Sequence, residues 1–184
     1  MDRFKFTKGP IDGLYIIEPS VFGDNRGYFM ETYNYNDFAD AGLDVAFVQD
    51  NQSASRKGVL RGLHFQKNFP QGKLVRVIKG EVFDVAVDIR RDSETFGKWF
   101  GIVLTEENKK QLYVSKGFAH GFLVLSDYAE FCYKCTEFYH PEDESGIRWN
   151  DSDIGVKWLL DGIDNIILSE KDKTNPSFKD FIKR

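Results

Sequence analysis

Two strand-like runs meet at a Lys-Gly pair in Lys73-Leu-Val-Arg-Val-Ile-Lys-Gly-Glu-Val-Phe-Asp-Val-Ala-Val-Asp88, and this stretch decides the fold class. Both runs are rich in Val and Ile, which favour strands over helices. The two-residue loop Lys79–Gly80 predicts a hairpin in which Lys73 lies opposite Ala86. We therefore expect a mainly β protein built from antiparallel strands.

The predicted hairpin has one face that mixes charged and apolar side chains. Lys73 would have Asp84 and Asp88 as diagonal neighbours across the ladder. On an open sheet such a face is a solvated surface, whereas in a closed barrel it lines a polar cavity in which the carboxylates keep Lys73 charged. The members of this face are Lys73, Val75, Val77, Val82, Asp84, Ala86 and Asp88.

Further strand-like runs alternate with Gly- and Asp-rich turns, a pattern typical of an antiparallel sandwich or barrel. They are Gly13–Glu18, Tyr28–Tyr33, Val45–Gln49, Val59–Gln66, Trp99–Leu104, Gln111–Val114, Gly121–Leu125 and Glu130–Phe138. Short helices are expected at 37–41, with Asn36 as N-cap and Gly42 ending it, and around 178–183 in a helical tail at roughly 170–184. So little helix between the strands argues against a doubly wound parallel sheet.

Length and composition favour a single domain over residues 1–184. Hydrophobic residues make up 41% and aromatic residues 15%, which suits a packed, strand-rich core. The formal net charge of −4 argues against a nucleic-acid partner, so the positive groups that meet an anionic ligand must be concentrated locally. Met1–Pro10 is too polar for a signal peptide and no apolar run approaches a membrane span, so we expect a cytoplasmic protein without membrane contact.

Cys132 and Cys135 form a C-x-x-C pair, which raises the possibility of a redox dithiol or half of a zinc site. Their surroundings indicate a strand, on which residues three apart point to opposite faces. The histidines also lack a metal-binding pattern, because His64 has no second histidine two residues away. We therefore expect two reduced thiols, no metal, and an imidazole that acts as an acid or base.

The stretch Val59-Leu-Arg-Gly-Leu-His-Phe-Gln66 carries the clearest functional signal. A regular strand would place His64 on the face of Gly62, and Arg61 on the opposite, mostly apolar face. An arginine there is costly unless it meets an anion, and Gly62 would let a ligand approach the imidazole. His64 alone is typical of a hydrogen-bonded core histidine, but the combination points to a site.

Several blocks between about Gly13 and Asp172 resemble, in order and spacing, those of the dTDP-4-dehydrorhamnose 3,5-epimerase family. They are Phe22-Gly-Asp-Asn-Arg-Gly-Tyr-Phe-Met-Glu31, Val48-Gln-Asp-Asn-Gln-Ser53, Arg61-Gly-Leu-His-Phe-Gln66, Gln71-Gly-Lys-Leu-Val-Arg-Val77, Gly80–Asp88, Gly117-Phe-Ala-His-Gly-Phe122 and Ser169-Glu-Lys-Asp172. The resemblance implies a cupin-type jelly-roll barrel and a homodimer that works without metal or cofactor. It also implies epimerisation of dTDP-4-dehydro-6-deoxy-D-glucose at C3 and C5, a step of dTDP-L-rhamnose and polysaccharide biosynthesis.

The resemblance also implies catalytic roles for four residues of this chain. His64 corresponds to the general base, supported by Asp172 through the imidazole. Tyr133 corresponds to the proton donor on the opposite face of the sugar. Lys73 corresponds to the cation that stabilises the enolate at the C4 oxygen.

Substrate-binding positions follow from the same resemblance. They are Arg26, Arg61 and Lys171 for the diphosphate, Gln49 and Asn51 for base and sugar, Glu31, Glu144, Lys73 and His120 as further contacts, and Phe22, Phe29 and Tyr139 as candidates for stacking on thymine. In such enzymes the N-terminal part of one subunit completes the site of the other. We therefore expect Arg26 and Glu31 to act across a dimer interface. Glu144 is equally compatible with a solvated acidic loop.

Three other functions fit parts of the pattern. A single-centre epimerase or a ketoisomerase on a related nucleotide sugar would use the same base and ketone. A sugar-binding or structural cupin would bind a ligand without turnover. A metal-dependent cupin oxygenase would need a bound metal. One sequence does not decide between one and two epimerised centres.

Overall fold

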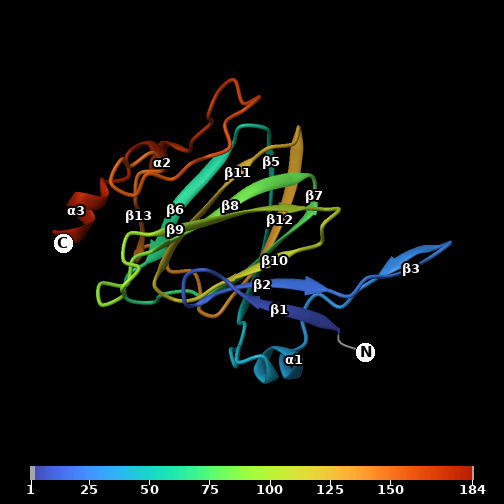
Figure 1. The fold of residues 1–184 in the computed structure, drawn as a ribbon. Helices are drawn as coiled ribbons and strands as arrows, with labels where there is room; N and C mark the ends of the chain where they lie inside the picture. The colour runs from blue at the N-terminus through green and yellow to red at the C-terminus, as the bar shows by residue number, and fades with distance from the viewer. Residues whose placement is uncertain (1–2, 184) are drawn as a thin grey trace.

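The structure, a computed structural model, describes residues 3–183, and most of its strands form two antiparallel sheets (Figure 1). The six-stranded sheet has the order β1 (Phe4–Lys8), β2 (Leu14–Pro19), β10 (Gln111–Val114), β7 (Lys73–Lys79), β12 (Tyr128–Cys135) and β5 (Gln49–Arg56). The five-stranded sheet has the order β13 (Glu144–Gly146), β6 (Leu60–Gln66), β11 (Phe118–Val124), β8 (Glu81–Asp88) and β9 (Trp99–Thr105).

The remaining elements are short. A two-stranded hairpin consists of β3 (Phe22–Asp24) and β4 (Gly27–Phe29), and the helices are α1 (Tyr35–Asp40), α2 (Glu170–Lys173) and α3 (Phe178–Ile182). The predicted mainly β class with a few short helices is therefore confirmed. No helix within residues 3–183 has the length and apolar character needed to cross a lipid bilayer.

The main core lies between the inner faces of the two sheets. Val75 and Phe131 from the six-stranded sheet pack there with Val82, Ala86 and Phe122 from the five-stranded sheet, and all five are buried. This burial follows from the period of two along each strand, which turns alternate side chains toward the opposite sheet. The predicted faces of β7 and β8 are thus confirmed, although their pairing is not.

The outer faces of both sheets are also covered. The C-terminal segment packs Ile147, Trp158 and Phe178 on the five-stranded sheet, and Phe38 of α1 packs in a cluster that covers the six-stranded sheet. Strand β8 therefore has apolar neighbours on both faces, and seven of its eight residues are buried. This double burial explains why Val82, Phe83, Val85, Ala86 and Val87 are apolar on both faces of the strand.

The predicted hairpin between β7 and β8 is wrong. Strand β7 pairs with β10 and β12, whereas β8 pairs with β11 and β9 in the other sheet. The Lys79–Gly80 pair is therefore a corner at which the chain changes sheets. Gly80 has a φ of +76°, and a Cβ there would lie 2.1 Å from the carbonyl oxygen of Tyr128. The Lys-Gly turn predicted that β7 pairs with β8. Instead, each of these strands pairs with two other strands and packs against apolar side chains on both of its faces.

Two local predictions also need correction, and some strands were not predicted. The apolar run 45–49 is mostly a loop that packs Val45 and Phe47 beneath the six-stranded sheet, while the polar segment after it forms β5. The N-cap of α1 is Asn34, whose Oδ1 accepts from the N–H groups of Asn36 and Asp37. Strands β1, β3 and β13 were not predicted. The strands β3 and β13 have only three residues each, whereas Phe4-Lys5-Phe6-Thr7 in β1 does alternate and could have been recognised.

Candidate active site

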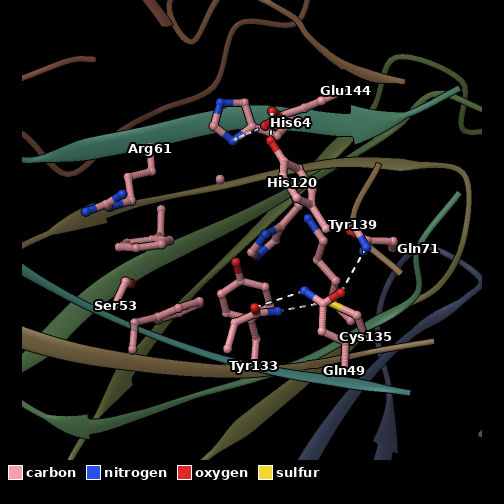
Figure 2. Close-up of a pocket in the computed structure, with 15 residues that line it drawn as sticks. Gln49, Ser53, Arg61, His64, Gln71, His120, Tyr133, Cys135, Tyr139 and Glu144 are labelled. Atoms are coloured by element: carbon pink, nitrogen blue, oxygen red, sulfur yellow. Dashed lines mark hydrogen bonds and ion pairs between the residues drawn. The ribbon is translucent and has the colours of Figure 1, made fainter. Parts of the chain in front are cut away.

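A cavity of about 370 Å³ opens between the two sheets, and side chains from both of them line it (Figure 2). One wall comes from β5, β7 and β12, and the other from β6, β11 and β13. Nine of the predicted site residues line this cavity: Gln49, Asn51, Arg61, His64, Lys73, His120, Tyr133, Tyr139 and Glu144.

Strand β6 contains an irregularity that brings two predicted residues to the same cavity. His64 pairs with His120, and Arg61 pairs with Phe122. The paired residues are three positions apart on β6 but only two apart on β11, so β6 carries one extra residue. This bulge reverses the alternation, and Arg61 therefore lines the cavity with His64 instead of pointing to the opposite face. The predicted opposite placement of Arg61 is wrong for that reason.

The same irregularity changes the interpretation of Gly62. A Cβ at Gly62 would lie 2.6 Å from Cα of Gly121 and 2.8 Å from the carbonyl oxygen of His120. The glycine is thus required by the close approach of β6 and β11. Access of a ligand to His64 is not what demands it.

His64 is held from behind by Asp172. Nε2 of the imidazole donates a hydrogen bond to Oδ1 of this carboxylate, whose side chain is 2% exposed. Helix α2 positions Asp172, since Ser169 is the N-cap and its Oγ accepts from the Asp172 N–H at 3.1 Å. Burial works to raise the pKa of Asp172, but the hydrogen bonds from His64 and Ser169 lower it overall. Asp172 is therefore an anion that fixes one tautomer of the imidazole.

Glu144 faces the other ring nitrogen of His64, with 3.9 Å between Oε1 and Nδ1. Its Oε2 accepts from the hydroxyl of Tyr139 at 2.6 Å and also contacts Nζ of Lys171. Burial works to raise the pKa of Glu144, but Lys171, Tyr139 and His64 together lower it. In turn, Glu144 and burial raise the pKa of Tyr139 to about 12. The solvated-loop interpretation of Glu144 is wrong, because this carboxylate lies in the cavity.

Tyr133 enters the cavity from β12, on the wall opposite His64 (Figure 2). Burial is the main cause that raises the pKa of Tyr133, so its hydroxyl stays protonated at neutral pH. Nζ of Lys73 lies 5.9 Å from the centre of the Tyr133 ring. Burial lowers the pKa of Lys73, while Cys135, Glu144 and Asp84 act in the opposite direction.

Hydrogen bonds to neighbouring residues hold several of the polar side chains that line the cavity. Oε1 of Gln49 accepts from the Tyr139 N–H at 2.9 Å, and Nε2 of Gln49 donates to Oδ1 of Asn51 at 3.0 Å. Arg61 donates from Nε and one terminal nitrogen to Oγ of Ser55, at 3.2 and 3.1 Å. These contacts order the amide groups on the wall from β5 and the Arg61 guanidinium on the wall from β6, where they can bind a polar, anionic ligand.

Four predicted residues do not join the cavity within one chain. Phe22, Arg26 and Phe29 belong to the β3–β4 hairpin, and Arg26 there forms an ion pair with Asp24. Glu31 follows that hairpin and pairs with Arg3 at 3.4 Å. Their expected action on the site of a second subunit stays a prediction.

Several cavity residues were not predicted. Ser53 and Gln71 line the cavity, and so does Cys135, whose Sγ accepts from Nδ2 of Asn51 at 3.6 Å. Ser53 could have been found from β5, because it continues the alternation of Gln49 and Asn51. Cys132 lies outside this lining, as expected for a neighbour three residues away on a strand. Within residues 3–183 no group of three or more His, Cys, Asp or Glu side chains is arranged to hold a metal ion.

The arrangement can remove and return a proton on opposite sides of one bound molecule. A carboxylate-supported imidazole and a protonated phenol face the cavity from opposite sheets, and the amino group of Lys73 lies near the phenol ring. A carbon acid next to a carbonyl is the substrate class that such a set suits, because a nearby cation stabilises the enolate.

Comparisons with known proteins agree with this chemistry. Residues 8–180 match the family model described as dTDP-4-dehydrorhamnose 3,5-epimerase. A protein of that name from Methanothermobacter thermautotrophicus is 58% identical over 173 residues, which is 94% of either chain. The crystal structure of dTDP-6-deoxy-D-glucose-3,5-epimerase from Legionella pneumophila, in complex with dTDP-4-keto-L-rhamnose, matches with a TM-score of 0.93 at 49% identity, over 96% of this chain and 93% of that one.

A second solved structure extends the comparison to the nucleotide. The dTDP-4-dehydrorhamnose 3,5-epimerase of Bacillus anthracis, with TDP and PPi bound, matches with a TM-score of 0.91 at 42% identity. The match covers 95% of this chain and 99% of that one. On the strength of the family match and these similarities, the chain belongs to the dTDP-4-dehydrorhamnose 3,5-epimerase family.

Proposed function

We propose that this chain epimerises dTDP-4-dehydro-6-deoxy-D-glucose at C3 and C5, giving dTDP-4-dehydro-L-rhamnose for dTDP-L-rhamnose biosynthesis. The observation that carries the proposal is the position of His64 and Tyr133 on opposite walls of one cavity, with Lys73 beside Tyr133. Inversion of a carbon needs this arrangement, because the proton must leave from one face and return to the other. The ligands named for the similar structures, dTDP-4-keto-L-rhamnose and TDP, support the choice of a dTDP-sugar.

Each inversion is an enolisation followed by protonation from the other face. His64, with its Nε2–H held by Asp172, takes a proton from the carbon next to the C4 ketone. The electron pair of the broken C–H bond moves onto the C4 oxygen, where the ammonium of Lys73 stabilises the enolate. Tyr133 then gives its phenolic proton to the opposite face of the carbon. The imidazolium loses a proton to solvent and the phenolate regains one, so no cofactor is consumed.

Solvent exchange is the direct test. The substrate is incubated with the protein in D₂O, and NMR follows the signals of the protons at C3 and C5. We expect deuterium at both carbons in the product. Label at one carbon alone would indicate a single-centre epimerase, and no label at either carbon would overturn the proposed proton abstraction.

We further propose that the protein acts as a homodimer in which the β3–β4 hairpin of one copy completes the cavity of the other. The hairpin extends away from the two sheets (Figure 1). It exposes Phe22, Tyr28 and Phe29, with 46%, 58% and 65% of their surface accessible. A group of exposed aromatic side chains on a projecting hairpin supports burial against another chain. Arg26 and Glu31 would then reach the diphosphate or sugar from that copy.

Mixing two inactive variants tests the exchange. In a mixed dimer of H64A and R26A with exchanged hairpins, one cavity carries both substitutions and the other carries neither. We therefore expect turnover to reappear when the two variants are unfolded and refolded together. If each cavity used its own hairpin, both cavities would stay defective and no turnover would return.

We also propose that the protein is located in the cytoplasm. Cys132 and Cys135 are free thiols, which supports a reducing compartment. Immunoblotting of fractionated cells is the test, and recovery of the protein with secreted or periplasmic material would contradict this placement.

A further inference from the structure

A second histidine–carboxylate pair lies in the cavity wall, and the proposed mechanism does not use it. Nε2 of His120 lies 2.9 Å from Oδ1 and 3.0 Å from Oδ2 of Asp84. Asp84 is 0% exposed and His120 is 7% exposed. A carboxylate buried to this degree requires a hydrogen-bonding or cationic partner, and a bifurcated bond from His120 provides one.

The strands explain why the pair forms. Asp84 lies on β8 and His120 on the neighbouring β11, where Phe122 pairs with Asp84 and His120 with Ala86. The two side chains are therefore diagonal neighbours on the inner face. His120 reaches the lining of the cavity, whereas Asp84 lies behind it. Asp84 thus acts on the cavity only through other groups.

Asp84 and Lys73 lie on the inner faces of opposite sheets, since Asp84 alternates with Val82 and Ala86 on β8, and Lys73 precedes Val75 on the same face of β7. Lys73 belongs to β7 in the opposite sheet. Together with His120 and His64 it lines both the main cavity and a second, small cavity of about 20 Å³. Asp84 is one of three groups that counteract the effect of burial on the pKa of Lys73. The titratable groups around Lys73 are Asp84 from β8, His120 from β11, Arg61 and His64 from β6, Tyr133 and Cys135 from β12, Tyr139 from the loop after β12, and Glu144 from β13.

We propose that Asp84 is a positioning residue, which orients His120 and places a buried negative charge on the inner face opposite Lys73, where the enolate forms. This inference rests on the proposed epimerase chemistry, in which Lys73 must carry its charge. Glu144 is committed to Lys171 and Tyr139, and Cys135 is a neutral thiol because burial raises its pKa. Asp84 and Glu144 are thus the two carboxylates that act against the effect of burial on the pKa of Lys73, and Asp84 is the one that is fully buried. Its hydrogen bond directs Nε2–H of His120 away from the substrate and leaves Nδ1 as the other polar atom of the ring.

The substitution D84N removes the charge and keeps an oxygen that can accept from His120. We expect kcat to fall about 10- to 100-fold with KM nearly unchanged, as for the loss of a group that acts on the enolate. Without the nearby anion, Lys73 loses its proton more easily. The alkaline limb of the kcat profile therefore moves to lower pH, by about one pH unit. An unmoved alkaline limb would overturn the inference.

Asp88 offers a matched control on the same strand. It is also 0% exposed, but it binds Arg90, Ser93 and Thr95 and does not line the cavity. We expect D88N to lower the thermal stability and to leave the alkaline limb of the kcat profile in place. A shift of this limb in D88N equal to that in D84N would show a general effect of buried charge, and would overturn a specific role of Asp84.

NMR separates failure of this inference from failure of the proposed function. With ¹³C-labelled lysine, the midpoint of the Lys73 titration without substrate should be lower in D84N than in the parent protein. An equal midpoint would overturn the inference even if the parent protein epimerises the sugar. Absence of turnover in the parent protein would instead refute the proposed function.

A measurement on the parent protein keeps the inference testable if D84N fails to fold. With ¹⁵N-labelled histidine, Nε2 of His120 should remain protonated between about pH 6 and about pH 9. An Nε2 without a proton in this range would overturn the orientation that we assign to Asp84.

Discussion

Oε1 of Glu144 lies 3.9 Å from Nδ1 of His64, and this contact places a carboxylate next to the ring nitrogen that Asp172 leaves free. The imidazolium that forms on proton capture therefore has a carboxylate at each ring nitrogen. Lys171 and Tyr139 hold Glu144 through its other oxygen, so that it does not turn toward solvent. Through this chain of contacts, Lys171 and Tyr139 are connected to the general base.

Replacement of His64 by alanine should abolish the chemical step and spare binding. We expect turnover to fall by at least about 100-fold, the usual contribution of a general base, with dTDP affinity largely kept. Steady-state kinetics and calorimetry of dTDP binding measure the two effects. H140A is the control, because His140 pairs with Glu142 and does not line the cavity. Normal turnover of H64A would refute the assigned role.

The variant Y133F should separate proton exchange from inversion. His64 can still remove a proton and return one to the same face, whereas the donor on the opposite face is lost. We expect deuterium to enter the substrate from D₂O with retained configuration, while product formation falls by about 100-fold or more. NMR of the recovered sugar measures both. Inverted product at the normal rate would show that another group protonates the opposite face.

The pKa of Tyr139 should fall in the variant E144Q. The hydrogen bond to Glu144 is the main cause that raises this pKa to about 12, and burial and the charge of Glu144 add to it. Without that charge the phenolate forms more easily, so the pKa should move toward 10, the usual value of tyrosine. The difference in ultraviolet absorption between each protein and its Y139F counterpart isolates this titration. An unchanged pKa would mean that Glu144 and Tyr139 do not interact in solution.

Asp88 should contribute stability that disappears in acid. Burial works to raise its pKa, but hydrogen bonds from Arg90, Ser93 and Thr95 lower it to about 2. Because the unfolded value is about 3.9, this contribution is present above pH 4 and is lost as the pH falls toward 2. It amounts to about 2 kcal/mol in the free energy of unfolding. Urea unfolding at several pH values should show this loss in the parent protein and a smaller one in D88N. An equal loss in both proteins would contradict it.

Treatment with a chelator should leave turnover unchanged, because the proposed steps use only groups of the chain. The measurement is epimerase activity after dialysis against EDTA, together with metal analysis of the same sample. Activity that disappears on dialysis and returns with a divalent cation would instead indicate metal-dependent chemistry.

Local sequence patterns gave correct predictions where the direction of a side chain depends only on its own strand. The alternation in β7 and β8 correctly groups Lys73 and Asp84 on the faces of Val75 and Val82, and the strand around Cys132 correctly separates the two thiols. Such predictions succeed because side-chain direction has a period of two along any strand, whatever its partners are. The resemblance of the sequence blocks selected His64, Lys73 and Tyr133, which the fold brings into one cavity.

Only the tertiary structure decided which strands pair and which distant groups meet. A two-residue loop predicts a hairpin, yet β7 and β8 belong to different sheets, since each buries both faces only with other partners. The bulge that brings Arg61 beside His64 exists only through pairing with β11. Asp84 and His120, 36 residues apart, likewise meet because β8 and β11 are neighbours. Strand order depends on the total apolar surface that the whole chain buries, and local periodicity does not encode it.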